Sequence, residues 1–217
     1  MIAVKLFIVV ILMVISVEEI YGHGMLMEPV NRSSAWRKGF KVPKNYDDDG
    51  NFCGGLNVQI KNGGKCGICG DDYALSRPRP NENTGIYGTG TIVKNLNDRY
   101  QKCQKIKAVV RITANHWGYF KFQICQLSKS KELETEECFE RYPLKLEDGS
   151  DRYVLKSHDA KDYTMTLILP KNLTCEHCVL RWEYVAANNW GVCEDGSEKM
   201  GCGPQETFKT CSDITIS

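Results

Sequence analysis

The sequence predicts an all-β protein built as an antiparallel β-sandwich. Several short segments alternate apolar and polar residues, long loops separate them, and the chain has no heptad pattern. Hydrophobic residues make up 42% of the 217 residues, which is enough to form a core and argues against a disordered chain. A chain of this length corresponds to one domain.

The strands are predicted where side chains alternate with period two, because one face of such a strand is buried and the other is solvated. Five segments show this alternation: residues 106–112, 120–125, 163–169, 179–186 and, as a short last strand, 211–216. Pro170 ends the third run. The acidic stretch from Lys129 to Glu140 is expected to be a solvated loop rather than a helix.

The first part of the chain is expected to be loops. Residues 23–56 show no clean period and contain Pro29 and Pro43, so we expect an ordered loop region held by Cys53 rather than a strand or helix. Residues 61–72 are rich in glycine and cysteine and predict a second loop that disulfides hold in place.

The N-terminus predicts a secreted protein. Lys5 is the only early charge, and the apolar run Leu6–Val17 has 12 residues, too few for a bilayer span of about 20 but suited to a signal peptide. Gly22 is a small residue of the kind that precedes a signal-peptide cleavage site. We therefore expect residues 1–22 to be removed, leaving residues 23–217 as a single secreted domain outside the membrane.

The cysteine count agrees with an oxidising compartment. The chain has 11 cysteines, and outside the cell these favour disulfides over zinc, even for the Cys66-x-x-Cys69 and Cys175-x-x-Cys178 spacings. Ten can pair and one is left over, and the sequence does not say which.

The formal charge of +1, from 28 basic and 27 acidic residues, gives no basic field for nucleic acid or an anionic membrane.

Cleavage after Gly22 would make His23 the first residue, and this changes its chemistry. A terminal histidine offers its α-amine and its ring Nδ1 to the same metal ion. The amine has a reference pKa of about 7.7–8.0, against about 10.4 for lysine, so it loses its proton more easily at neutral pH. A third nitrogen from a second histidine completes a flat, T-shaped set, which suits Cu(II).

His116 is the second histidine of this candidate site. It lies in the segment ANHWG, residues 114–118, the short connection between the first two predicted strands. A loop at the end of a sandwich presents side chains from a rigid base and is a common place for binding groups. The remaining histidines, His158 and His177, are expected to be structural or surface residues.

Short motifs recur in order along the mature chain: His23-Gly24-x-Leu26-x-x-Pro29-x-x-Arg32-Ser33-Ser34-x-Trp36, Cys53-Gly54-Gly55, Lys65-Cys66-Gly67-x-Cys69-Gly70-Asp71, Thr113-Ala114-Asn115-His116-x-Gly118 and Gly201-Cys202-Gly203-Pro204-Gln205-Glu206-x-Phe208. Together they resemble the insect-type lytic polysaccharide monooxygenases of auxiliary activity family 15. The motifs extend from the first mature residue almost to the last, so the resemblance covers the whole domain.

The resemblance implies an immunoglobulin- or fibronectin-III-like sandwich and a copper-binding histidine brace. His23, with its amine, and His116 would be the copper ligands. Ala114 would lie beside the open axial side, where a small side chain limits how ligands approach. Glu206 would be within reach of the oxygen co-substrate. Phe208 would take the protein-side axial position, where phenylalanine can neither ligate nor supply a phenolic electron, so we expect no tyrosyl radical there.

The resemblance also implies the activity. A secreted protein, expected to be a monomer, would use one copper ion, an external electron donor and O₂ or H₂O₂ to cleave glycosidic bonds of an insoluble polysaccharide by oxidation. We favour chitin over cellulose, with oxidation at C1, although none of these residues separates the two substrates.

Some surface residues bear on this expectation. Asn31 and Asn172 begin glycosylation sequons, and because Asn31 lies near the predicted copper site, we expect only Asn172 to carry a glycan. Four aromatic residues are candidates either for a sugar-binding face or for packing: Trp36, Tyr46, Trp117 and Tyr119.

Two other classes of protein fit part of the same pattern. One is a non-catalytic secreted copper carrier that uses the same brace, and it predicts copper binding without release of oxidised oligosaccharides. The other is a disulfide-rich polysaccharide-binding or adhesion domain without a metal, and it predicts that replacing His116 leaves copper affinity unchanged.

Overall fold

The protein folds as a β-sandwich of two mainly antiparallel sheets. The computed structural model describes residues 22–88, 99–100 and 104–217. The first sheet has the order β1-β3-β8-β6, formed by His23–Glu28, Lys105–Ala114, Asp162–Ile168 and Lys145–Leu146. The second sheet has the order β2-β12-β9-β4-β5, formed by Arg99–Tyr100, Thr207–Ile216, Cys175–Val185, Tyr119–Gln126 and Tyr142–Pro143.

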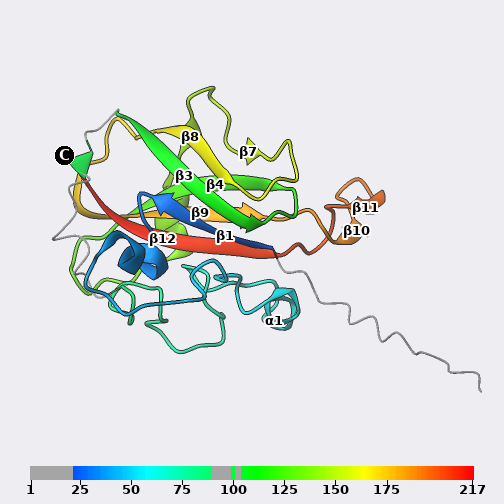
Figure 1. Cartoon of the computed structure of the whole chain (residues 1–217), viewed down its shortest axis with the longest axis horizontal. Helices are drawn as coiled ribbons and strands as arrows, with labels where there is room; N and C mark the ends of the chain where they lie inside the picture. The colour runs from blue at the N-terminus through cyan, green and yellow to red at the C-terminus, as the bar shows by residue number, and fades with distance from the viewer. Residues whose placement is uncertain (1–21, 89–98, 101–103) are drawn as a thin grey trace, which may run out of the picture.

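Two small additions extend the sandwich. The short β7, Tyr153–Val154, pairs with β4, and the hairpin of β10, Trp190–Val192, and β11, Glu198–Met200, forms a sheet of its own. Only the pairing of β2 with β12 is parallel among the described strands. The hairpin, the start of β1 and the start of β12 lie at one end of the molecule, and the C-terminus lies at the other (Figure 1).

The predicted alternation produces the core. In β3 every second residue from Ile106 to Ile112 is buried, and these side chains meet those of β4, β8 and β9 between the sheets. Trp182 and Tyr184 on β9 are fully buried there. Four of the five predicted strands are therefore confirmed as β3, β4, β8 and β9, and the fifth is the C-terminal half of the longer β12.

The prediction of loops throughout residues 23–56 is wrong. His23–Glu28 forms β1 and pairs with β3, Arg32–Lys38 forms the 3₁₀ helix η1, and Leu56–Lys61 forms α1. The strand does not alternate because four consecutive residues after His23 are buried, with β1 covered on both faces. An edge strand buried on both sides carries no period-two signal.

A second correction concerns residues 129–140. Glu136–Glu140 forms the short helix α2, whose N-cap Thr135 accepts a hydrogen bond from the Cys138 amide at 3.2 Å. The segment is also not fully solvated, because Glu134 and Phe139 are completely buried. Acidic residues in the first turn and a threonine N-cap are the local signals that favour this helix.

A layer of loops with the short helices η1 and α1, residues 29–88 and called the loop layer below, covers the outer face of the second sheet next to β12 (Figure 1). All ten residues of β12 are buried, including polar ones, because the core lies on one side and the loop layer on the other. The Cys69–Cys211 disulfide ties this layer directly to β12.

The cysteines form disulfides, as expected. The five bonds join Cys53 to Cys66, Cys69 to Cys211, Cys125 to Cys138, Cys175 to Cys178, and Cys193 to Cys202. All four cysteines of the two Cys-x-x-Cys motifs are thus in disulfides, although only Cys175 and Cys178 bond to each other. The eleventh cysteine, Cys103, lies outside the described residues.

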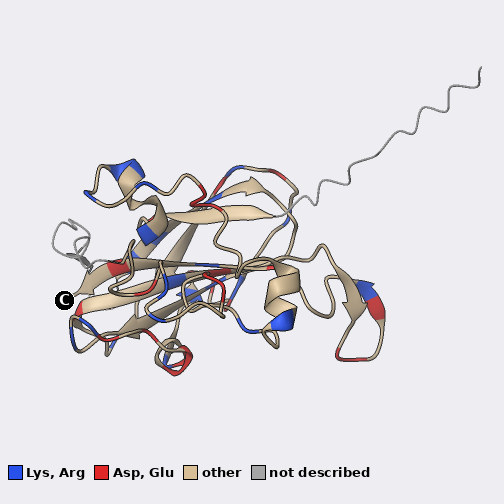
Figure 2. Ribbon diagram, turned by 90° about the horizontal axis from the view of Figure 1, so that it is seen from below, with Lys and Arg blue, Asp and Glu red and all other residues tan. Residues whose placement is uncertain are grey.

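Basic and acidic residues are interspersed over the described ribbon, without a large region of one sign (Figure 2). The Asn31 side chain is fully buried and bonds to the Leu26 carbonyl and to Ser34, so it is not accessible for glycosylation in the folded protein. Asn172 is exposed.

Within the described part of the chain, no helix has the length and apolar character needed to cross a membrane. The predicted signal segment, except for Gly22, falls outside that part.

Candidate metal centre

His23 lies at the end of the sandwich where β1 begins. It pairs with Ala114 on β3, and the amide of the next residue, Gly24, donates to the Asp49 carbonyl at 3.0 Å. The His23 ring is half-buried, with its centroid 6.2 Å from that of Phe52 and 6.5 Å from that of Phe208. The strand and two aromatic rings therefore fix the position of this residue.

The backbone of His116 is held on both sides. Its amide donates to the Tyr184 hydroxyl at 2.9 Å, and its carbonyl accepts from the Ala187 amide at 2.9 Å. Gly118, at φ +94°, closes the loop against β9, where a Cβ would come within 1.9 Å of the Val185 carbonyl oxygen. A loop that only glycine can complete at this point presents His116 from a rigid base.

The His116 ring points into the interior of this end and is only 8% exposed. Its Nδ1 lies 2.7 Å from Asn188 Nδ2 and 3.5 Å from Glu206 Oε2. The Asn188 amide nitrogen donates to Nδ1, and these two contacts on one edge of the ring fix the orientation of the imidazole. Asn188 follows β9, and Glu206 directly precedes β12, so segments next to two neighbouring strands of the second sheet supply both partners.

Gly22 fills a small space between these side chains. It is buried, and its amide donates to Glu206 Oε2 at 3.1 Å. A Cβ on Gly22 would lie 3.2 Å from His116 Nδ1 and 3.2 Å from the Phe208 ring. Adding the intervening covalent bonds places the His23 backbone nitrogen within about 7 Å of His116 Nδ1. The two predicted ligands are thus close neighbours.

Glu206 and Phe208 line the same space. The Glu206 side chain is 4% exposed, and the backbone carbonyl of Glu206 accepts from the Ala186 amide at 3.0 Å. Phe208 is fully buried and stacks on Tyr184 at 5.4 Å and on Phe52 at 5.9 Å between ring centroids. The aromatic stack makes one wall apolar and rigid, while Glu206 supplies a carboxylate in direct contact with Gly22.

The five residues singled out in the sequence meet at this end of the sandwich: His23, Ala114, His116, Glu206 and Phe208. Three neighbours were missed. Asn188 contacts the His116 ring, Tyr184 holds the His116 amide, and Phe52 packs beside His23. Tyr184 could have been found as an inward-pointing residue of the strand at 179–186, whereas the sequence carries no signal for the other two.

Burial raises the pKa of the Tyr184 phenol far above its ordinary value, and the charge of Glu206 adds to the shift. This hydroxyl therefore stays protonated at any physiological pH. Burial also raises the pKa of Asp47, with a further contribution from Asp49, while His23 opposes it.

Within residues 22–88, 99–100 and 104–217, no group of three or more His, Cys, Asp or Glu side chains is arranged to hold a metal ion.

Comparison with known proteins identifies the family. The family described as "Lytic polysaccharide mono-oxygenase, cellulose-degrading" matches residues 23–214. The AA15 lytic polysaccharide monooxygenase from Thermobia domestica, solved in the Cu(I) state, is 47% identical, covers 89% of this chain and 98% of its own, and superimposes with a TM-score of 0.85. The chain belongs to the AA15 lytic polysaccharide monooxygenases.

Other comparisons add little to this assignment. LPMO10B from Micromonospora aurantiaca covers 89% of this chain and 99% of its own, but at 12% identity and a TM-score of 0.41 the likeness is too weak to support an argument. No curated protein matches the chain at a significant level.

Membership of the family determines the class of activity. The chain is a copper-dependent polysaccharide monooxygenase, an oxidoreductase that uses one copper ion and an external reductant with O₂ or H₂O₂. Lytic polysaccharide monooxygenases act on insoluble polysaccharides. The sandwich fold and the family predicted from the sequence are both confirmed.

Proposed function

We propose that the protein is secreted with residues 1–22 removed, and that the α-amine and ring of the new terminal His23 hold one copper ion together with the His116 ring. The position of Gly22 carries this proposal. Gly22 occupies a space bounded by His116, Glu206 and Phe208 directly at the His23 nitrogen. Its removal frees that space and creates the amine in one step.

The residues present suit copper. Two imidazoles and an amine form an all-nitrogen set, and Cu(II) prefers square-planar or tetragonal nitrogen ligands. No carboxylate cluster in the described residues offers an alternative centre built from side chains alone. The terminal amine, with a reference pKa near 8, also loses its proton at a modest free-energy cost at neutral pH.

Three further residues shape the site. Phe208 closes the protein side with a ring that cannot ligate, and its stack on Tyr184 holds it in place. Glu206 Oε2 contacts the Gly22 amide and lies 3.5 Å from His116 Nδ1, which supports a role in holding or passing a proton once Gly22 is removed. Ala114, paired with His23, leaves room on the open side because its side chain is a single methyl group.

When bound, copper would supply the redox chemistry: the external reductant gives electrons, O₂ or H₂O₂ is the oxidant, and a C–H bond beside the glycosidic link is oxidised. We propose chitin as the substrate, oxidised at C1, with the protein acting as a monomer outside the cell. The family resemblance allows both chitin and cellulose, and cellulose, which the description of the matched family names, is the alternative substrate.

The test begins with the N-terminus and copper affinity of the secreted protein. N-terminal sequencing and intact mass should show a start at His23. Calorimetry should then show tight binding of one Cu(II) ion, with a loss of affinity of at least about 100-fold in His116→Ala and in a form that keeps Gly22. His177→Gln is the matched control, since His177 bonds to Asp213 rather than to residues of this site.

Products decide the activity. The copper-loaded protein with ascorbate and O₂ or H₂O₂ should release C1-oxidised oligosaccharides from chitin, detected by mass spectrometry. Release from cellulose alone would overturn the substrate, and copper binding without any oxidised product would favour the carrier. A start at any residue other than His23, or unchanged copper affinity in His116→Ala, would overturn the brace.

A further inference from the structure

Trp117 differs from the core tryptophan of this protein. It directly follows His116, yet its side chain is 44% exposed, whereas Trp182 on β9 is completely buried. The Trp117 ring stacks on His158, with 5.6 Å between ring centroids and 17° between the planes. His158 is itself exposed. The two rings therefore lie stacked on each other at the protein–water boundary rather than in the core.

The backbone at Trp117 adopts a conformation that a tryptophan rarely has. Its φ is +55°, in the left-handed region, whereas bulky side chains strongly prefer negative φ. Strain of this kind persists only where the surrounding structure enforces it, and it concentrates at binding and catalytic sites. An exposed apolar ring and a strained backbone both cost stability. A tryptophan at this position is therefore expected to have a role that offsets these costs.

Asn115 enforces this conformation. Its Oδ1 accepts from the Trp117 amide at 2.9 Å, which closes a turn over His116. Its amide nitrogen donates to the carbonyls of Ser157 and Asp159, at 3.2 and 2.9 Å, and to the Tyr163 hydroxyl at 2.9 Å. One buried side chain thus fixes both the loop that carries Trp117 and the loop that carries His158.

A second contact ties the two loops together. The Leu155 amide donates to the Gly118 carbonyl at 3.0 Å, directly after Trp117. The stacked rings consequently sit on two segments that are cross-linked by hydrogen bonds on both sides. A rigid aromatic surface loses little conformational entropy when it binds a ligand.

We propose that the exposed Trp117 ring, supported by the stacked His158 ring, is a stacking platform for a sugar ring of the polysaccharide, next to the proposed copper ligand His116. This inference rests on the proposed function. In β-1,4-linked polysaccharides such as chitin and cellulose the pyranose substituents are equatorial, so each ring presents an apolar C–H face that packs on a flat aromatic ring. The Cα of Trp117 is about 3.8 Å from that of His116, so the platform and the proposed copper ligand are attached at neighbouring positions of one loop.

The experiment measures binding to the insoluble polysaccharide separately from copper binding. The copper-loaded wild type, Trp117→Ala, Trp117→Phe and Leu75→Ala are mixed with chitin and with cellulose, and the partition coefficients are determined by depletion. Leu75 is the matched control because its exposed fraction, 47%, is similar to the 44% of Trp117. It lies in a different loop, where its amide donates to the Asp72 carbonyl. Copper affinity and thermal midpoint are measured for each variant.

Trp117→Ala should bind the polysaccharide about tenfold more weakly, the effect of losing a central aromatic contact. Trp117→Phe, which keeps a flat ring, should lose no more than about threefold, and Leu75→Ala should match the wild type. Copper affinity should be retained in all three variants. Equal partition of wild type and Trp117→Ala overturns the platform, as does an equal loss in Leu75→Ala. Weak copper binding by the wild type itself would overturn the proposed brace instead. The partition coefficients of the variants would then still show whether Trp117 binds the polysaccharide.

Discussion

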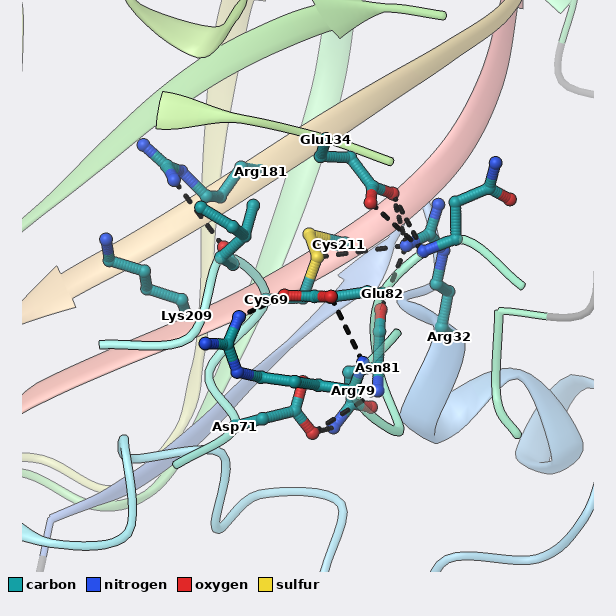
Figure 3. Close-up of a disulfide and its surroundings, with 12 residues drawn as sticks. Arg32, Cys69, Asp71, Arg79, Asn81, Glu82, Glu134, Arg181, Lys209 and Cys211 are labelled. Atoms are coloured by element: carbon teal, nitrogen blue, oxygen red, sulfur yellow. Dashed lines mark hydrogen bonds and ion pairs between the residues drawn. A yellow bond between two sulfur atoms is a disulfide. The ribbon is translucent and has the colours of Figure 1, made fainter. Parts of the chain in front are cut away.

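Replacing Arg32 by methionine should destabilise the protein strongly, because this arginine neutralises two buried carboxylates. Its guanidinium is 1% exposed and bonds to both oxygens of Asp213, at 2.9 and 2.7 Å, and to Glu134 at 2.6 Å. The Asp213 and Glu134 side chains are 1% and 0% exposed. Figure 3 shows Arg32 and Glu134 facing each other beside the Cys69–Cys211 disulfide, where the loop layer meets β12.

The size of the effect follows from this burial. Removing one partner of a buried ion pair costs about 3–5 kcal/mol, because the other charge is left without compensation. For a domain of this size, each kcal/mol lowers the melting temperature by roughly 2–4 °C, so Arg32→Met should melt about 6–20 °C lower. Arg111→Met is the control. Arg111 makes the same two-pronged contact with Asp162, but both side chains are about 45% exposed, and exposed pairs contribute about 1 kcal/mol or less.

The pH dependence provides a second test of the same contact. Burial alone would raise the pKa of Asp213, but the charge and hydrogen bonds of Arg32, with a further bond from His177, outweigh it and hold this pKa well below its usual range. The stabilisation is therefore present above the unfolded pKa of about 3.9 and is lost as the pH falls towards the folded value. Without Arg32, the buried carboxyl instead gains stability by taking up a proton in acid.

Differential scanning calorimetry of wild type and Arg32→Met from pH 3 to pH 7 tests both statements. The gap between the two melting temperatures should be largest at neutral pH and should narrow in acid. A gap of less than about 3 °C at pH 7, or one that widens on acidification, would show that the buried pair is not what stabilises this interface.

Three further predictions concern other parts of the fold. Gly118→Ala should fail to fold or should melt at least about 6 °C lower, because a Cβ there lies 1.9 Å from the Val185 carbonyl oxygen; a native-like thermal midpoint would contradict this. Removing the Cys69–Cys211 disulfide by a double alanine substitution should cost about 3–5 kcal/mol, measured by guanidinium unfolding, since the two cysteines are 142 residues apart. Burial raises the pKa of Tyr184, so spectrophotometric titration of the folded wild type and of Tyr184→Phe should count the same number of tyrosines ionising up to about pH 11, and one fewer in the variant would refute the shift.

Local patterns in the sequence were sufficient for the central strands. Residues 106–112 and 120–125 alternate because one face of each strand meets the core and the other meets water, and this asymmetry is written in the order of the residues. The family motifs likewise placed His23 and His116 on one candidate site, since the first mature residue and a short loop between strands are both visible in the sequence.

Other features depend on contacts between distant segments, and the sequence could not supply them. β1 shows no period because both its faces are covered, and β12 is longer than its alternation suggests because the loop layer buries polar residues such as Asp213. The partner of Cys69 is Cys211, chosen by the packing of that layer on the sheet rather than by spacing. The space that Gly22 fills is bounded by His116, Glu206 and Phe208, which only the fold brings together. Periodicity records which side of a segment meets water, whereas pairing and enclosure depend on segments that only the folded chain brings together.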